Sequence, residues 1–222
     1  SELELKKWLE THECVICGSD QIWNNNITGN GGAYFAVDCN VKKISYAASL
    51  GTTQLNETQK SNIINYLPSF SSISVREPGS AEQLTKILHR EIQVVLDPVF
   101  LLDRDEWRKL SRPVSVDSNY LFLYFLQENE KLLEFAKKYA EENGLKIYEV
   151  HPTLATRHNG CKRLENVGPK EFIWLIENAS CVCTNSFHAT AFSTIFRKKL
   201  IHIPNSKSPE RTTSLLERVG IE

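Results

Sequence analysis

Along the whole chain, short apolar runs alternate with longer amphipathic stretches. Runs rich in β-branched and aromatic residues predict strands, and stretches with apolar residues on one side of a 3.6-residue period predict helices. The predicted strands are residues 14–17, 43–47, 72–75, 92–96, 120–126, 146–150, 180–184 and 200–203. The predicted helices are residues 3–9, 56–70, 79–89, 104–110, 128–143, 169–178, 187–196 and 210–219. We interpret residues 151–168 as a long irregular loop.

The order of these elements predicts the fold class and the domains. Strands separated by helical crossovers indicate parallel sheets with helices on both faces, which is an α/β fold. The pattern pauses at residues 111–119, a stretch of Pro, Ser, Asp and Asn that is typical of a linker, and then restarts. We therefore predict two Rossmann-like lobes, residues 1–112 and residues 113–222, that meet at a cleft.

Composition excludes some classes of partner. The 26 Lys and Arg residues nearly balance the 27 Asp and Glu residues, so no overall basic field favours nucleic acid or an anionic membrane. The longest wholly apolar run, residues 120–126, is far too short to span a membrane. No charged and then apolar signal peptide opens the chain. We therefore expect a cytoplasmic protein without a transmembrane segment.

The cysteines allow either a metal site or a structural interpretation. The C-x-x-C spacing of Cys14 and Cys17 is typical of zinc or redox sites. A second C-x-x-C is missing, however, and no pair of histidines with ligand spacing completes a site. We therefore predict no metal and interpret Cys14, Cys17, Cys181 and Cys183 as buried strand residues in a reducing cytoplasm.

Small polar and charged residues gather just after the predicted strands. In open parallel sheets this carboxyl edge is where ligands bind, although polar loops and helix caps produce part of the same pattern. The candidate binding residues at these positions are Gly18, Ser19, Asp20, Ser49, Gly51, Glu77, Asn185 and Ser186.

Arg76 and His188 carry the candidate chemistry. Arg76 follows an apolar strand and could bind a carboxylate or phosphate in bidentate fashion, or pair internally with Glu77 or another acid. Ser186 would cap the helix that starts at Phe187, which places His188 in its first turn, where the helix dipole attracts anions. Such a histidine can exchange protons near neutral pH, but spacing alone favours a structural histidine.

Three further residues have two interpretations each. Lys207 and Arg211 follow the next strand and could add positive charge to the cleft, although solvated positions are the simpler interpretation. Trp23 could stack on a sugar or fill the core of its lobe.

Several ordered strings resemble the signature blocks of the polysaccharide pyruvyltransferase family. They follow one another at sensible spacings over nearly the whole chain, and the closing SLLERVG resembles the C-terminal helix of that family. The blocks are GSDQIWN (residues 18–24), SYAASLG (45–51), SVRE (74–77), LDPVFLL (96–102) and TNSFHATAFS (184–193).

This resemblance implies a glycosyltransferase-B-like pair of lobes and phosphoenolpyruvate as co-substrate, without a cofactor or metal. The implied reaction forms a cyclic pyruvate ketal on two hydroxyls of a sugar in a bacterial capsule or exopolysaccharide. The implied acceptor is a lipid-linked oligosaccharide, which allows peripheral association with a membrane.

By the same resemblance, Arg76 matches the arginine that acts on the donor and His188 the acid–base histidine, with Lys207 or Arg211 as a further basic residue. Asn185 stands where aspartate is common and Ala189 where glycine is common.

Two other functions remain open from the sequence. One is a nucleotide-sugar-dependent glycosyltransferase of similar fold, because function resides in the site rather than in the fold. The other is a non-catalytic family member that binds carbohydrate.

Overall fold

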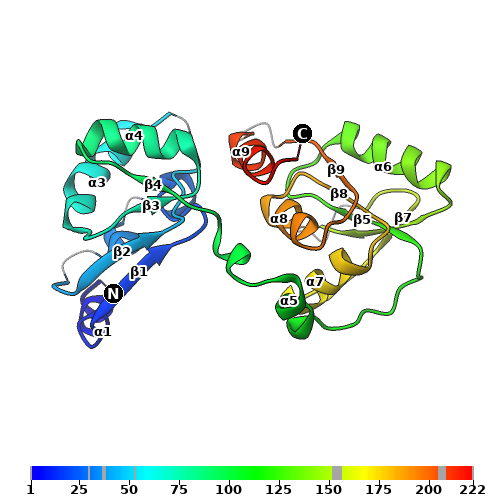
Figure 1. The fold of residues 1–222 in the computed structure, drawn as a ribbon, viewed down its shortest axis with the longest axis horizontal. Coiled ribbons are helices and arrows are strands. Elements are labelled where there is room, and N and C mark those ends of the chain that lie inside the picture. The colour runs from blue at the N-terminus through cyan, green and yellow to red at the C-terminus, as the bar shows by residue number, and fades with distance from the viewer. Residues whose placement is uncertain are drawn as a thin grey trace. The chain divides into compact units, whose positions relative to one another are not determined.

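The computed structural model describes residues 2–29, 31–36, 39–52, 54–151, 157–204 and 209–221. The chain divides into two compact units (Figure 1), which we call the first lobe, Ser1–Pro98, and the second lobe, Val99–Glu222. The strands within each lobe pair in parallel, which confirms the predicted α/β class.

Short parallel strands form the sheet of the first lobe. β1 (Cys14–Gly18) pairs with β2 (Lys42–Tyr46), and β3 (Ser74–Val75) pairs with β4 (Gln93–Val94). Isolated parallel bridges from Ile44 to Ser72 and from Ala48 to Val75 join the two pairs. The helices of this lobe are α1 (Glu2–Leu9), α2 (Asn25–Thr28), α3 (Glu57–Tyr66) and α4 (Pro78–Leu88), with 3-10 turns η1 (Gly32–Phe35) and η2 (Leu67–Ser69).

Trp23 lies at the centre of the first-lobe core. Its side chain is 1% exposed, its ring stacks on Phe35 at 5.8 Å between centroids, and it meets Phe70 edge-on at 6.1 Å. An indole buried in this way stabilises the lobe through its large apolar area. Of the two interpretations of Trp23, the structure therefore supports core packing.

The second lobe contains a five-stranded parallel sheet in the order β7-β6-β5-β8-β9. Its strands are β5 (Tyr120–Tyr124), β6 (Lys146–Val150), β7 (Cys161–Arg163), β8 (Cys181–Thr184) and β9 (Leu200–His202). The strand order reverses between β5 and β8, because the chain builds outward from β5 in one direction and then in the other. In open α/β sheets this switch point opens a crevice at the carboxyl ends of the strands.

Helices cover both faces of the second-lobe sheet (Figure 1). On one face α6 packs Leu132 and Ala136 against Leu121 and Leu123 of β5. On the other face the core of α7 and α8 lies against Phe122. β5 is thus buried on both sides, which explains its continuous apolar sequence. The helices are α5 (Arg104–Leu110), α6 (Glu130–Glu142), α7 (Pro169–Asn178), α8 (Phe187–Ile195) and α9 (Glu210–Arg218), with a 3-10 turn η3 (Pro98–Leu101).

Two sequence predictions about local structure are wrong. Residues 151–168 were expected to be irregular, but β7 forms within them as an edge strand of three residues, too short and polar to show an apolar pattern. Cys14 was expected to be buried, but β1 alternates, so that Cys17 faces the core while Cys14 and Ile16 are exposed. No helix in the described part of the chain is long and apolar enough to cross a membrane.

The boundary between the lobes lies earlier than residue 112. Residues 99–112 were placed in the first lobe, but they pack with the second. The Trp107 ring meets Phe192 of α8 edge-on at 5.0 Å, and its Nε1 donates to the Val99 carbonyl at 2.8 Å. The backbone of Arg112 also donates to the Lys170 carbonyl. An amphipathic α5 does not reveal in its sequence which lobe it covers.

We expect Trp107→Ala to lower the free energy of unfolding of the second lobe by about 2–3 kcal/mol, because a half-buried aromatic ring is lost from its core. Urea unfolding combined with amide hydrogen exchange should show faster exchange in α8 and unchanged exchange in β1 and β2. Trp8→Ala is the matched control, because Trp8 is 60% exposed on α1. Equal effects of the two changes would contradict the assignment of residues 99–112 to the second lobe.

Candidate functional site

Arg76 lies at the carboxyl end of β3 with its side chain only 3% exposed. Its Nε donates to Glu77 Oε1 at 3.0 Å, and its Nη1 donates to Asp97 Oδ2 at 2.7 Å. Nη2 lies 3.6 Å from Asp20 Oδ1. Of the two alternatives left open for Arg76, the structure therefore shows the internal ion pair.

The charge of Arg76 is held in place by its neighbours. Burial alone would lower the pKa of the guanidinium, but the charges and hydrogen bonds of Glu77 and Asp97 raise the pKa above its usual value. Both carboxylates are themselves buried. Buried charges persist only when they are paired and hydrogen-bonded, so the three groups form one unit.

The loop after β1 joins this unit. Ser19 Oγ donates to Asp97 Oδ2 at 2.8 Å, so the carboxylate that binds Arg76 also holds Ser19. The Asp20 side chain is 61% exposed and is the part of the cluster that a ligand can reach. Gly18 permits the close strand pairing, because a Cβ there would lie 2.1 Å from the Tyr46 carbonyl oxygen.

Ser49 and Gly51 stabilise the same loop. The fully buried Ser49 donates its backbone N–H to the Asp20 carbonyl at 2.9 Å, and its Oγ accepts from Gly51 N at 3.1 Å. Gly51 has a φ of +67°, and a Cβ there would lie 2.2 Å from Gln21 Oε1. The structure thus gathers the first-lobe candidates at one edge, but most of them hold the loop rather than face solvent.

The second-lobe candidates lie at the switch point between β5 and β8. Asn185 follows β8, accepts from Leu126 N at 3.0 Å and donates from Nδ2 to the Gln127 carbonyl at 2.8 Å. Ser186 is the N-cap of α8, as predicted, and its Oγ accepts from Ala189 N at 3.5 Å. The Asn185 side chain therefore ties the turn after β5 to the start of α8.

His188 is half-buried in the first turn of α8, as predicted. The Phe187 ring stands perpendicular to His188 at 5.4 Å, and the Arg211 guanidinium lies over Phe187 at 5.6 Å. The first turn of α8 carries no acidic residue, so the helix dipole and Arg211 both favour an anion there. Ala189 is fully buried in the core, and Lys207 lies outside the described residues.

Arg76 and His188 belong to different lobes, so their meeting in one cleft stays a prediction. The lobes each supply a carboxyl edge that carries predicted residues. The first edge is acidic and internally paired, and the second edge presents a histidine beside a helix N-terminus.

The sequence analysis missed His202, at the end of β9. Its Nδ1 donates to the Thr184 carbonyl at 3.0 Å, and its Nε2 lies 2.9 Å from Thr212 Oγ1 of α9. Burial lowers the pKa of His202, although its hydrogen bond to Thr184 opposes the shift. A neutral His202 thereby fastens α9, which carries Arg211, to the sheet.

Potential metal ligands and two buried thiols can be assessed in the described ranges. No group of three or more His, Cys, Asp and Glu side chains there is arranged to hold a metal ion. Burial raises the pKa of Cys17 and of Cys181 to about 11, so these thiols stay protonated near neutral pH. Only the thiolate is reactive, which favours a structural role for them.

Comparison with known proteins identifies the family and the fold. A family model described as polysaccharide pyruvyl transferase matches residues 2–207. No curated protein sequence matches the chain. Among solved structures, the UDP-GlcNAc 2-epimerase from Methanocaldococcus jannaschii is similar, with 16% identity and a TM-score of 0.58 over 97% of this chain and 73% of that chain. Its complex with UDP-GlcNAc and UDP gives 15% identity and a TM-score of 0.56, over 96% of this chain and 66% of that chain.

The UDP-GlcNAc 2-epimerase from Neisseria meningitidis bound to UDP-GlcNAc is similar at 13% identity and a TM-score of 0.52, over 99% of this chain and 71% of that chain. The chain therefore spans about two thirds to three quarters of these enzymes. At these identities the likeness shows the fold alone. It confirms the predicted GT-B-like fold of two Rossmann-like lobes with parallel sheets.

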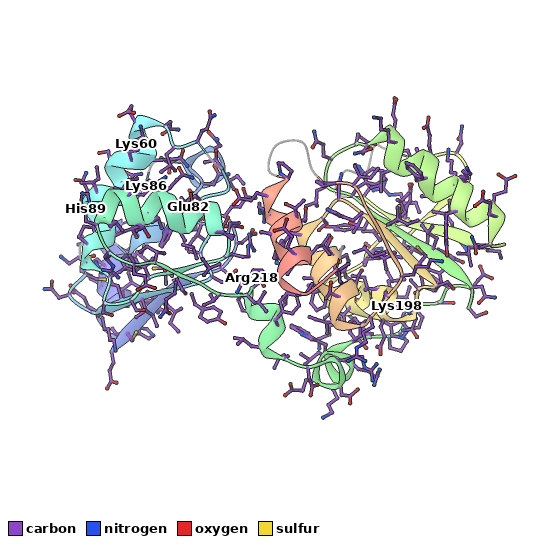
Figure 2. The ribbon with its side chains drawn as sticks, turned by 45° about the horizontal axis from the view of Figure 1, so that its top comes forward. Lys60, Glu82, Lys86, His89, Lys198 and Arg218 are labelled. Atoms are coloured by element: carbon purple, nitrogen blue, oxygen red, sulfur yellow. The ribbon has the colours of Figure 1, made fainter. Side chains whose placement is uncertain are left out.

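We expect Arg76→Gln to lower the free energy of unfolding by about 3–5 kcal/mol, because it leaves Glu77 and Asp97 as buried carboxylates without their cation. Urea unfolding at pH 7 measures this loss. Lys60→Gln is the control. Lys60, which Figure 2 labels on α3, forms an exposed pair with Glu57, and its loss should cost about 0.5 kcal/mol or less. A similarly small effect at Arg76 would contradict a tightly paired cluster.

We expect the stability of the second lobe to depend on pH through His202. Its pKa is lowered in the folded chain, so the unfolded chain binds the proton more readily, and stability present above pH 6.5 is lost as the pH falls below that value. Urea unfolding at pH 7.5 and pH 5.5 should therefore show a larger penalty for His202→Gln at about pH 7.5 than at about pH 5.5. A penalty that is independent of pH would contradict a buried neutral imidazole.

Proposed function

Since the chain belongs to the polysaccharide pyruvyl transferase family, we propose that it transfers pyruvate from phosphoenolpyruvate to two hydroxyls of a sugar. The match to residues 2–207, across both lobes, is the observation that carries this proposal. The product would be a cyclic ketal in a bacterial capsule or exopolysaccharide.

The proposed reaction needs a proton donor beside a site for anions. Protonation of the methylene carbon of phosphoenolpyruvate creates an oxocarbenium ion at the adjacent carbon, which a sugar hydroxyl attacks. Phosphate then leaves, and the second hydroxyl closes the ketal. We assign the proton donor to His188 and the anion site to the N-terminus of α8 with Arg211, because these groups adjoin one another at the second-lobe edge.

The structure changes the role that we propose for Arg76. A donor clamp needs donors that face the ligand, but Nε and Nη1 of this guanidinium already bind Glu77 and Asp97. We therefore propose that Arg76 positions the loop after β1, through the Asp97 carboxylate that also binds Ser19. Arg76 would then affect phosphoenolpyruvate through the position of this loop, and not through a direct bidentate contact.

The proposed setting is the cytoplasm, with a lipid-linked oligosaccharide as acceptor at the membrane surface and no cofactor. All six cysteines are free, which agrees with a reducing compartment.

We expect incubation with phosphoenolpyruvate and a bacterial oligosaccharide to release phosphate and to add the mass of a pyruvate ketal to the sugar. Phosphate assay and mass spectrometry measure the two products. Sugar transfer from a nucleotide donor, without consumption of phosphoenolpyruvate, would instead indicate a glycosyltransferase. Carbohydrate binding without turnover of either donor would indicate a non-catalytic protein.

We expect His188→Ala to lower kcat about 10²–10⁴-fold with an unchanged circular dichroism spectrum, because the chain loses its proton donor but no core residue. His89→Asn is the matched control. His89 is exposed at the end of α4 (Figure 2) with a φ of +52°, which asparagine tolerates. Wild-type turnover in the His188 variant would remove His188 from the mechanism.

A further inference from the structure

A second group of titratable side chains lies at the carboxyl end of the second-lobe sheet. Glu149 is the buried fourth residue of β6, His151 follows that strand, and Glu128 follows the turn after β5. His158 lies just before β7 and completes the group. The sequence analysis gave none of these residues a role, because they are separated along the chain and match no motif.

Three of these side chains are hydrogen-bonded end to end, and the fourth lies beside them. Glu149 Oε2 lies 2.7 Å from His158 Nδ1, and His158 Nε2 lies 3.1 Å from Glu128 Oε2. The other oxygen of Glu128 lies 2.9 Å from His151 Nε2, an ion-pair distance without hydrogen-bond geometry. The result is a hydrogen-bonded row of carboxylate, imidazole and carboxylate, with a second imidazole beside its exposed carboxylate.

The row leads from the lobe interior to solvent. The Glu149 side chain is 3% exposed, whereas that of Glu128 is 53% exposed. The buried Phe125 packs against both imidazole rings, with centroids 5.4 Å from His151 and 5.3 Å from His158. An apolar ring at this position excludes water from the links and leaves Glu128 as the accessible end.

The hydrogen bonds limit where the protons can be. When Glu149 and Glu128 are both ionised they can only accept, and His158 between them then donates from both of its ring nitrogens. In that state the group holds one proton more than two carboxylates with neutral imidazoles would hold. A carboxylate–imidazole–carboxylate row of this kind can take up a proton at one end and share its charge along the row.

Two elements of the second lobe bring charged or titratable groups near the row. On β7, Arg163 donates to the His151 carbonyl at 3.2 Å. Cys161 also lies near Glu149; burial first, and then the Glu149 charge, raises the pKa of its thiol to about 11. From α6, Lys137 acts on the same thiol.

The row adjoins the candidate site through Asn185. This amide binds Leu126 N and the Gln127 carbonyl, and Glu128 is the next residue. On the other side, Asn185 directly precedes Ser186, the cap of the helix that carries His188. The exposed end of the row and His188 therefore share the switch point of one sheet, where ligands of such folds bind.

We propose that Glu149, His158 and Glu128, flanked by His151, form a proton relay whose exposed end, Glu128, takes up a hydroxyl proton of the sugar acceptor. This proposal rests on the proposed function. When the hydroxyl oxygen attacks the oxocarbenium carbon, a C–O bond forms, the O–H bond breaks, and its proton moves to Glu128. Of the two hydroxyl protons released in the whole reaction, one replaces the proton that His188 gave to the methylene carbon. The other leaves on phosphate.

The first test measures the protonation of the His158 ring and needs no assay of turnover. In the full chain labelled with ¹⁵N-histidine, NMR at pH 7 should show hydrogen on both ring nitrogens of His158. Glu128→Gln should convert this ring to the form with one proton, because the glutamine amide can itself donate to Nε2. A His158 ring with one proton in the wild-type chain, or an identical ring pattern in the variant, would overturn the relay.

The second test measures turnover and its pH dependence. With phosphoenolpyruvate and acceptor, Glu128→Gln should lower kcat about 10²-fold and change the pH dependence of kcat. Glu149→Gln, which acts through His158, should change the same pH profile with little effect on KM. Glu134→Gln is the matched control, because it removes one exposed carboxylate from α6 of the same lobe.

The outcomes separate the relay from the proposed function. A wild-type kcat and pH profile in Glu128→Gln would overturn the relay while the proposed function stands. If the wild-type chain shows no pyruvyl transfer, the proposed function fails, and the NMR result alone supports or overturns the relay.

Discussion

The parallel pairing of strands is the constraint on which the rest of this structure depends. Each strand of the second-lobe sheet runs in the same direction as its neighbours, so every crossover helix returns the chain to the same starting edge. All loops that follow strands are therefore collected at the opposite edge. Residues far apart in the sequence, such as Glu128, His151 and Asn185, therefore come to lie near one another at this edge.

The two lobes use this edge in different ways. In the first lobe a cation, Arg76, is surrounded by carboxylates and fixes the loops after β1, β3 and β4 to one another. In the second lobe the fixed element is a neutral amide, Asn185, and the titratable groups around it retain an exposed end. The first arrangement resists change because Glu77 and Asp97, which bind the guanidinium, are both buried. The second leaves the Glu128 carboxylate exposed to solvent.

Hydrophobic periodicity, together with turn and cap residues, predicted most of the fold. The long apolar run at β5 and the Ser186 cap of α8 are local signals, so the structure confirms them. The edge strand β7 escaped prediction because its three residues carry no pattern, and the lobe boundary was misplaced because Trp107 reveals its partner only in three dimensions. Contacts of that kind depend on tertiary packing, which no local window contains.

The candidate site was predicted in part. His188 could be placed because a cap and a helix start are adjacent in sequence. The internal pairing of Arg76 with Asp97 could not be chosen over a ligand clamp, since 21 positions separate the two residues. The row of Glu149, His158 and Glu128, with His151 beside it, was invisible for the same reason, because its order in space differs from its order along the chain.

The Asn185 side chain makes two hydrogen bonds that an aspartate at the same position could not both make. It accepts from one backbone group and donates to the next, and an ionised aspartate can only accept. An aspartate here would set a negative charge against the Gln127 carbonyl, and the turn that leads to Glu128 would have to adopt another path. Position 185 and residues 126 and 127 thus form a single hydrogen-bonded unit, so the side chain at position 185 determines the path of the turn that leads to Glu128.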